Sequence, residues 1–255
     1  MQEIETHIKN FKTISLFEME NVQLLDRMES KFYFPIEELP VILNQMITDY
    51  YILDVNGVKV NRYESIYYDT ADFKLYLLNQ NRIAKRFKVR YRNYLDSKLS
   101  FFEIKEKNNK NRTIKHRILS NDSDCSSDKM IVNDEIEKLI QTTTLYNSKV
   151  FQKKLAVYYS RLTFVNKTDC ERVTLDLYLN FTNKTESVHY SNLVIAEVKQ
   201  TKTTLNSIFI NIMRRHKINE GGLSKYCFGV AILFPKMKQN LFKEQIKNLI
   251  KTTIC

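Results

Sequence analysis

The sequence predicts an α+β protein in which about eight antiparallel strands close into a β-barrel tunnel, with helices flanking the strands. Six stretches of the chain alternate charged and apolar residues at period two, and in each stretch the charged residues fall on one face. Apolar residues at helical spacing occur between these stretches. Only 4 Gly and 3 Pro occur among 255 residues, which argues against flexible linkers, so residues 1–255 are expected to form a single domain.

The charged rows predict a binding site if the barrel closes with these rows inward. The rows are Arg27, Glu29 and Lys31 in RMESKF; Arg86, Lys88, Arg90 and Arg92 in RFKVRYR; Glu103, Lys105 and Lys107 in FEIKEK; Lys115 and Arg117 in TIKHR; Arg172, Thr174 and Asp176 in RVTLD; and Glu197 and Lys199 in IAEVK. A barrel built this way encloses a cationic tunnel that also carries carboxylates. Such a tunnel suits a polyanion and its metal.

The first half of the chain divides at its turn and helix signals. A short helical lead-in precedes a strand at 26–34, and Pro35 and Glu37 open a helix with apolar residues at helical spacing up to Ile47. Pro40 lies in the first turns of that helix, where proline is tolerated. A strand at 63–68, a short helix at 73–78 and three basic strands, which end near residue 118, follow.

The second half begins with a polar loop at 120–129, SNDSDCSSDK, which we expect to be mobile. Asp134 is expected to cap a helix through Ile140. Strands are predicted at 154–165, 172–179 and 192–199, and a helix at 204–215. Ser224 is expected to open another helix, and an amphipathic helix is predicted at 239–254.

Composition restricts the class of partner and the compartment. The formal net charge of +11 predicts an anionic partner, which could be a phosphate compound, a nucleic acid or an acidic membrane surface. The four cysteines are widely spaced without a CxxC pair, which is typical of free thiols in a reducing compartment. No apolar run approaches the roughly 18 residues that cross a bilayer. We expect a cytoplasmic protein, with a peripheral position at the inner face of the membrane as an alternative.

Seven motifs in series resemble the polyphosphate polymerase domain of the vacuolar transporter chaperone type, within the CYTH-like triphosphate tunnel metalloenzymes. They are RxExK at 27–31, SIYYDT at 65–70, KVRYR at 88–92, FFEIKEK at 101–107, RVTLD at 172–176, AEVK at 196–199 and SKYCFG at 224–229. Each motif alone would be weak, but their order and spacing cover nearly the whole chain. The sequence departs from the family at Gly222, where relatives place a lysine.

The resemblance implies a tunnel of eight antiparallel strands in which the terminal phosphoryl group of ATP is transferred onto a growing polyphosphate chain, with Mn²⁺ or Mg²⁺. It implies catalytic roles for Arg90, Arg92, Lys105, Arg172 and Lys225. The phosphate-binding set comprises Arg27, Lys31, Lys88, Arg90, Arg92, Lys105, Lys107, Lys115, Arg117, Arg161, Arg172, Lys199, Ser224 and Lys225. Glu197 is the principal metal ligand, with Glu29 and Glu103 as further candidates.

The residue types fit this chemistry, although each motif has a plainer interpretation. Guanidinium groups two residues apart, as at Arg90 and Arg92, can each hold two phosphate oxygens, but a solvated basic face would look the same. Carboxylates bind hard divalent cations, whereas Glu29 and Glu103 could equally form local ion pairs. Ser224 and Lys225 could hold a phosphate at a helix start or merely cap it.

Other functions remain open from the sequence. Hydrolysis of tripolyphosphate or a nucleoside triphosphate would use the same tunnel, with water replacing the acceptor. A nucleic-acid-binding module would fit the net charge and the 30 Tyr and Phe residues, but carboxylates within the cationic rows count against it, so no nucleic acid is expected. The four histidines form no metal or catalytic motif, and no glycine-rich phosphate loop occurs. The lysine-rich C-terminal helix could contact a membrane protein that exports the polymer, or could pack with a solvated basic side.

Overall fold

The computed structural model describes residues 2–21, 27–110, 112–120, 129–201, 206–222 and 224–253. The α+β class is confirmed. The strands are β1 (Thr13–Ser15), β2 (Arg27–Pro35), β3 (Tyr50–Asp54), β4 (Asn61–Asp69), β5 (Arg86–Tyr94), β6 (Leu99–Lys107), β7 (Thr113–Ser120), β8 (Gln152–Asn166), β9 (Glu171–Thr182), β10 (Ser187–Tyr190), β11 (Leu193–Thr201) and β12 (Glu220–Gly221). The helices are α1 (Gln2–Ile8), α2 (Leu16–Asn21), α3 (Leu39–Met46), α4 (Lys74–Gln80), α5 (Asp134–Thr144), α6 (Ile208–Arg215), α7 (Lys225–Leu233) and α8 (Lys243–Thr253).

The described strands form one sheet in the order β12-β2-β11-β9-β8-β4-β5-β6-β7, with β1, β3 and β10 attached beside this path. Neighbours on the path are antiparallel. Within the described residues no pairing joins β7 to β2 or β12, so the predicted closed barrel of about eight strands is not confirmed. Period-two alternation decides which face a side chain takes, but it does not decide whether two edge strands pair.

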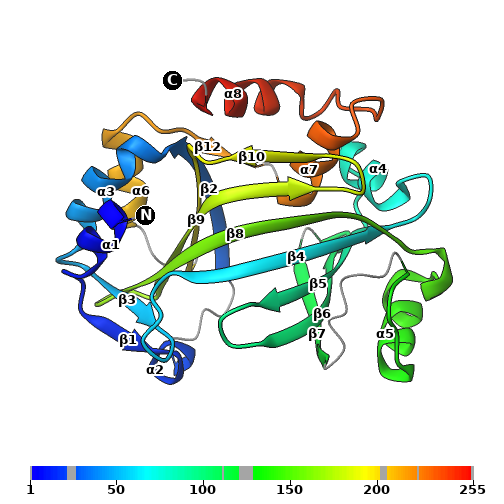
Figure 1. Cartoon of the computed structure of the whole chain (residues 1–255), viewed down its shortest axis with the longest axis horizontal. Helices are drawn as coiled ribbons and strands as arrows, with labels where there is room; N and C mark the ends of the chain where they lie inside the picture. Colours follow the sequence, from blue (N-terminus) through cyan, green and yellow to red (C-terminus); the bar gives the residue numbers. More distant parts are fainter. Residues whose placement is uncertain are drawn as a thin grey trace.

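The sheet nevertheless curls until its two ends face each other (Figure 1). Lys105 on β6 and Glu29 on β2 lie near opposite ends of the strand order, yet Lys105 Nζ lies 4.0 Å from Glu29 Oε2. The charged rows therefore meet across an interior, as the alternation predicted, although the edges do not hydrogen-bond.

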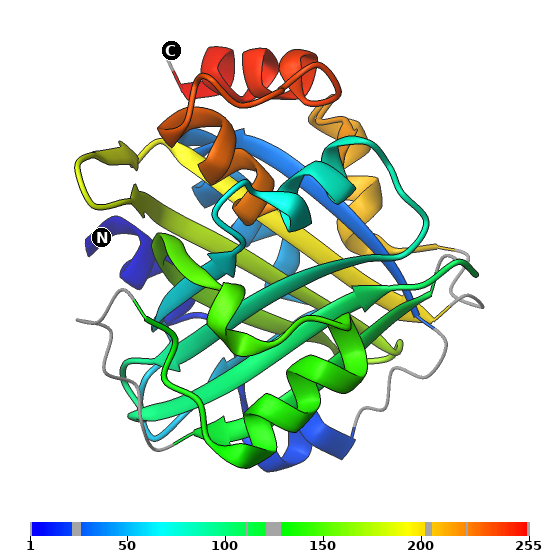
Figure 2. The ribbon, with the colours of Figure 1, turned by 90° about the vertical axis from the view of Figure 1, so that its right-hand side faces the viewer.

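Helices α1, α3, α5 and α6 cover the outer face of the curled sheet (Figures 1 and 2). One apolar cluster joins α1, α3 and α6 to β2, β8, β9 and β11. Another packs α5 on the outer face of β4, β5 and β6. A third cluster instead packs α4, α7 and α8 against the cavity face of the sheet. Leu155 and Val157 on β8 share a face with Arg161, and Ile195 on β11 shares a face with Glu197, so these helices form part of the cavity wall. Because successive residues alternate, burying the apolar rows on the outside directs the charged rows inward.

The predicted elements differ from the structure mainly in short segments and boundaries. The short strands β1, β3, β10 and β12 were not predicted, because two to five residues carry little periodic signal. Asn133, not Asp134, caps α5 by accepting a hydrogen bond from Ile136 N at 2.9 Å. The C-terminal helix begins at Lys243 rather than 239. Residues 22–26, 121–128 and 202–205, which include most of the predicted polar loop, lie outside the described residues.

Candidate functional site

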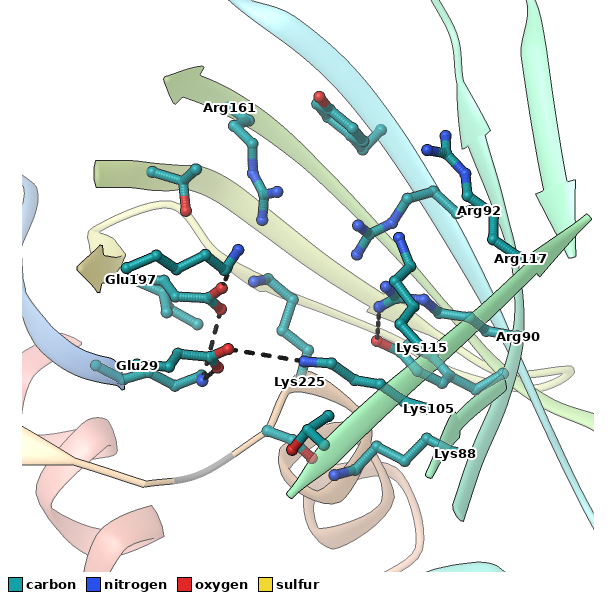
Figure 3. A pocket seen from close by; sticks show the side chains of 18 of the residues that line it. Glu29, Lys88, Arg90, Arg92, Lys105, Lys115, Arg117, Arg161, Glu197 and Lys225 are labelled. Atoms are coloured by element: carbon teal, nitrogen blue, oxygen red, sulfur yellow. Dashed lines mark hydrogen bonds and ion pairs between the residues drawn. The ribbon is translucent and has the colours of Figure 1, made fainter. Parts of the chain in front are cut away.

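The inner face of the curled sheet lines a cavity of about 1110 Å³ (Figure 3). The predicted phosphate-binding residues that line it are Lys31, Lys88, Arg90, Arg92, Lys105, Lys107, Lys115, Arg117, Arg161, Arg172, Lys199, Ser224 and Lys225. Arg27 lies at the start of β2, but its side chain falls outside the described part of the chain. The structure therefore brings the cations of seven strands and one helix to a single site, while their individual roles stay predictions.

Like charges face each other directly across strands in this cavity. Lys88 on β5 pairs in register with Lys105 on β6, and Lys105 pairs with Lys115 on β7. Like charges directly opposite on neighbouring strands are destabilising. Burial, reinforced by neighbouring cations, lowers the pKa of Lys105 to about 7 and that of Lys31 and Lys115 to about 8. The empty cavity thus holds ammonium groups poorly, and a bound polyanion would stabilise them.

Glu103 neutralises part of this charge from beneath the cavity surface. Its Oε2 accepts hydrogen bonds from Arg90 Nε at 2.8 Å and Arg90 Nη2 at 2.6 Å, and its Oε1 lies 2.5 Å from Lys115 Nζ. Burial alone would raise the pKa of Glu103, but the charges of Arg90, Arg92 and Lys115 outweigh it and hold that pKa far below its ordinary value. Both carboxylate oxygens of Glu103 are engaged, so the geometry favours its ion-pairing interpretation over metal binding.

Asp176 performs a similar task for Arg161 and Lys225. Its two oxygens accept from Arg161 Nε at 2.5 Å and Arg161 Nη2 at 2.8 Å, and Lys225 Nζ forms an ion pair with the same carboxylate. Burial opposes ionisation of Asp176, yet the two cations lower its pKa to about 2. Lys225 is the first residue of α7, whose N-terminus Ser224 caps by accepting from Cys227 N at 3.2 Å. Asp176 therefore holds a strand guanidinium and a helix ammonium together.

Two further carboxylates, Glu29 and Glu197, face the cavity from adjacent strands (Figure 3). Glu197 lies 2.5 Å from Lys199 Nζ and 3.5 Å from Lys31 Nζ, and Lys31 also forms an ion pair with Glu29. Burial opposes ionisation of Glu197, but Lys199, Lys31 and Lys105 hold its pKa well below the ordinary value. Glu197 therefore carries a negative charge at neutral pH.

The carboxylates Glu29 and Glu197 fit a magnesium or manganese ion when substrate oxygens complete the coordination. Hard divalent cations take oxygen ligands, and Mg²⁺ in particular is commonly held by one or two carboxylates together with phosphate oxygens and water. Within the described ranges no group of three or more His, Cys, Asp or Glu side chains could hold a metal by itself. The assignment of Glu197 as principal metal ligand stays a prediction that this donor set supports.

Tyr159 supports two cavity residues from below, a role that the sequence analysis missed. Its ring stacks on Tyr63 at 5.3 Å, and Arg161 and Lys225 lie over it at 5.3 and 4.8 Å from the ring centroid. Its buried hydroxyl has no hydrogen-bond partner among the residues that the structure describes. Burial alone would raise the pKa of Tyr159, but Arg92 and Arg161 outweigh it and lower that pKa. The sequence could have indicated this, because Tyr159 lies two residues before Arg161 on β8 and therefore on the same face of the strand.

Asp69 explains why the motifs at 65–70 and 224–229 occur together. Its carboxylate is fully buried and accepts from Leu75 N and Tyr76 N at 2.8 Å each, and from the Tyr226 hydroxyl at 2.5 Å. The carboxylate thus fastens the end of β4 to α4 and to α7, next to Lys225. Asp69 therefore has a structural role at this junction.

The part of the chain that the structure describes contains no helix with both the length and the apolar composition to span a bilayer. Cys170 and Cys227 are free thiols. Among curated proteins, no sequence match was found.

Comparison with solved structures identifies similar folds at low sequence identity. A candidate adenylate cyclase from Bacillus halodurans matches with a TM-score of 0.56 and 12% identity, covering 82% of this chain and 100% of that chain. HpAC1 from Hippeastrum, a candidate adenylyl cyclase described as having a dominant triphosphatase activity, matches with a TM-score of 0.48 and 11% identity, covering 83% and 98%. The first of these supports the fold alone.

The family comparison covers most of the chain. The family model described as VTC domain matches residues 26–234, a range that contains all seven motifs and every predicted site residue. The fold is similar to that of the candidate adenylate cyclase from Bacillus halodurans, and the chain belongs to the VTC domain family.

Proposed function

We propose that the protein is a polyphosphate polymerase, which transfers the γ-phosphoryl group of ATP onto inorganic polyphosphate in a metal-dependent reaction. The observation that carries this proposal is the face-to-face arrangement of like charges on β5, β6 and β7, opposite the carboxylates of β2 and β11. An array with this charge excess fits a condensed phosphate chain, and membership of the VTC domain family supports the same substrate class. The enclosed position of these cations does not favour the nucleic-acid alternative.

The reaction needs positioning and charge stabilisation rather than a protein nucleophile. A terminal oxygen of the acceptor chain attacks the γ-phosphorus, the bond to the β,γ-bridging oxygen breaks, and ADP leaves with the charge of that oxygen. Arg90 and Arg92 can donate to the equatorial oxygens, because their guanidinium groups lie side by side on the cavity face of β5. Arg161 and Lys225, which Asp176 holds in place, add two positive charges from the facing wall.

Glu197 and Glu29 would hold a divalent cation, which would supply positive charge to offset the charge that develops on the phosphates. Lys31 and Lys199 already contact Glu197, so these lysines can turn toward phosphate when a cation takes the carboxylate. We propose a cytoplasmic location, where ATP is supplied, and a membrane-protein partner for export of the polymer.

The test is incubation of the purified protein with ATP and MnCl₂, followed by gel electrophoresis with a stain for long phosphate chains. We expect chains in the wild type, and loss of ATP consumption in Arg90→Ala and Glu197→Gln with folding retained. Lys138→Ala, which removes an exposed charge from the outer helix α5, is the matched control and should behave as wild type. Exclusive release of orthophosphate would reject synthesis in favour of tripolyphosphatase or nucleoside triphosphatase activity.

A further inference from the structure

The cation row on β5 and β6 continues beyond the arginines assigned to the reacting phosphates. Arg86 begins β5 and lies directly opposite Lys107, which ends β6, and both line the cavity. Arg86 lies six residues from Arg92, so the row spans on the order of 20 Å of extended strand. That length exceeds what the three phosphates of ATP occupy, so part of the row is available to other groups.

This second like-charge pair has no local neutralisation. No described residue forms an ion pair with Arg86 or Lys107, whereas Arg90 and Lys115 share Glu103. Burial and the neighbouring Arg86 charge lower the pKa of Lys107. Arg86 Nη1 donates to the carbonyl oxygen of Ile83 at 2.9 Å, and that contact leaves the guanidinium its other donors. Two opposed cations without a carboxylate are destabilising unless an anion binds between them.

Arg82 adds a third cation at the same end of the cavity. It lines the cavity from the turn between α4 and β5, where its backbone adopts a left-handed conformation with φ of 53°. Non-glycine residues seldom adopt this conformation. The turn therefore holds the backbone of Arg82 in a sparsely populated conformation beside Arg86.

The opposite wall at this end carries no charge. It is formed by Leu241, Phe242 and Gln245. Gly222 lies beside Gln245: a side-chain Cβ at position 222 would be 3.8 Å from Gln245 Nε2. Phe242 is only 8% exposed and its ring lies 6.2 Å from that of Tyr76. The segment is therefore a fixed part of the wall, and it lies beyond the residues 26–234 that the family model covers.

We infer that Arg82, Arg86 and Lys107 form an outer track that binds the distal phosphates of a chain longer than a triphosphate. Leu241, Phe242 and Gln245 are the uncharged side chains of the opposite wall, and they direct the chain onto the β5–β6 side. Each added phosphate carries negative charge, so the chain follows the side that offers cations rather than the side that offers Leu241 and Phe242. The inference rests on the proposed function only in taking condensed phosphate as the ligand.

The experiment compares the binding of tripolyphosphate with that of a medium-chain polyphosphate to the purified protein of 255 residues, without ATP. Arg86→Ala and Lys107→Ala should each weaken medium-chain binding roughly fivefold, which corresponds to about 1 kcal/mol, and should leave tripolyphosphate binding within about twofold. The matched control is Lys85→Ala. Lys85 is exposed just before β5 and pairs with Glu106 at 3.8 Å, but unlike Arg86 and Lys107 it does not line the cavity.

A second variant adds charge instead of removing it. Gln245→Lys places an ammonium on the uncharged wall and should tighten medium-chain binding by a similar roughly fivefold factor, with tripolyphosphate again unaffected. The inference is overturned if the Arg86 and Lys107 variants weaken both ligands equally or neither. It is also overturned if Lys85→Ala weakens medium-chain binding as much as Lys107→Ala. Failure of the proposed function would instead appear as absent polymer synthesis with this length-dependent binding intact.

Discussion

Binding of a polyanion to this cavity should be coupled to proton uptake by its lysines. Lys105 has a pKa of about 7, and Lys31 and Lys115 have pKa values of about 8, because burial and neighbouring cations disfavour their charged forms. At pH 8 about two of these three ammonium protons are absent from the empty protein. Phosphate oxygens in contact with the amines favour the charged form and return each pKa toward its ordinary value. Tripolyphosphate binding at pH 8 should therefore take up about two protons.

The sign of the pH dependence follows from the same shifts. Because the bound state holds more protons, affinity for tripolyphosphate falls as pH rises through 7 to 9. The free energy of unfolding of the free protein changes in the opposite direction. Below the folded-state pKa these lysines are charged in both states, and holding the buried charges destabilises the fold. This destabilisation diminishes as pH rises from the folded-state pKa toward the ordinary lysine value of about 10.5. The ligand and the proton thus stabilise the same charged state of the cavity.

The assay is isothermal titration calorimetry at pH 8 in two buffers with different ionisation enthalpies, which gives the number of protons exchanged. Lys105→Arg is the informative variant, because arginine keeps the charge but does not titrate. Uptake should fall from about two protons to about one. The protonation of tripolyphosphate itself is the same for both proteins and cancels in the difference. Equal uptake by wild type and Lys105→Arg would refute the reasoning.

Two further predictions concern the carboxylates that hold the cations. Asp176→Asn should lower the free energy of unfolding at pH 7 by about 3 kcal/mol, because Arg161 and Lys225 lose a buried partner. The pKa of Asp176 is lowered to about 2, so the difference in the free energy of unfolding between wild type and Asp176→Asn should shrink by about 2 kcal/mol as pH falls from 4 to 2. Denaturant titrations that give the same difference at both pH values would contradict this prediction. Glu103→Gln should lower the melting temperature of the free protein, because it deprives Arg90 of its buried carboxylate. Adding tripolyphosphate should then raise the melting temperature more than it does for the wild type, because the ligand supplies the anion that Arg90 lacks. An unchanged rise would show that Arg90 does not reach the ligand.

The sequence predicted the inward face well, because a strand has only two faces and an apolar row determines which one is buried. Phe87, Val89 and Tyr91 alternate with the basic residues of β5, and all three are buried against the outer helices. The choice of face for every charged row followed from this alternation alone. Closure could not follow from it, since the pairing of two edges depends on the twist and coil of the whole sheet.

Partner choice within the site could not be predicted either, because it depends on register and on long-range packing. Glu103 faces Arg90 only because β5 and β6 pair in one particular register. Asp176 reaches Lys225 only because α7 docks against the strands, 49 residues further along the chain. The same limit applied to the C-terminal helix: its amphipathic pattern was visible, but its place in the cavity wall was not.

The cations of this cavity fall into two groups, those paired with a buried carboxylate and those that face other cations across the strands. Glu103 and Asp176 are both buried; Glu103 forms ion pairs with three cations and Asp176 with two, so those pairs can be retained without any ligand. Lys88, Lys105 and Lys107 face other cations across the strands. A folded chain tolerates such repulsion only where the rest of the structure stabilises it, and here the apolar outer face of β5 and β6 is packed against α5. A bound polyanion would relieve this repulsion, which is why the proposed phosphate path follows β5 and β6.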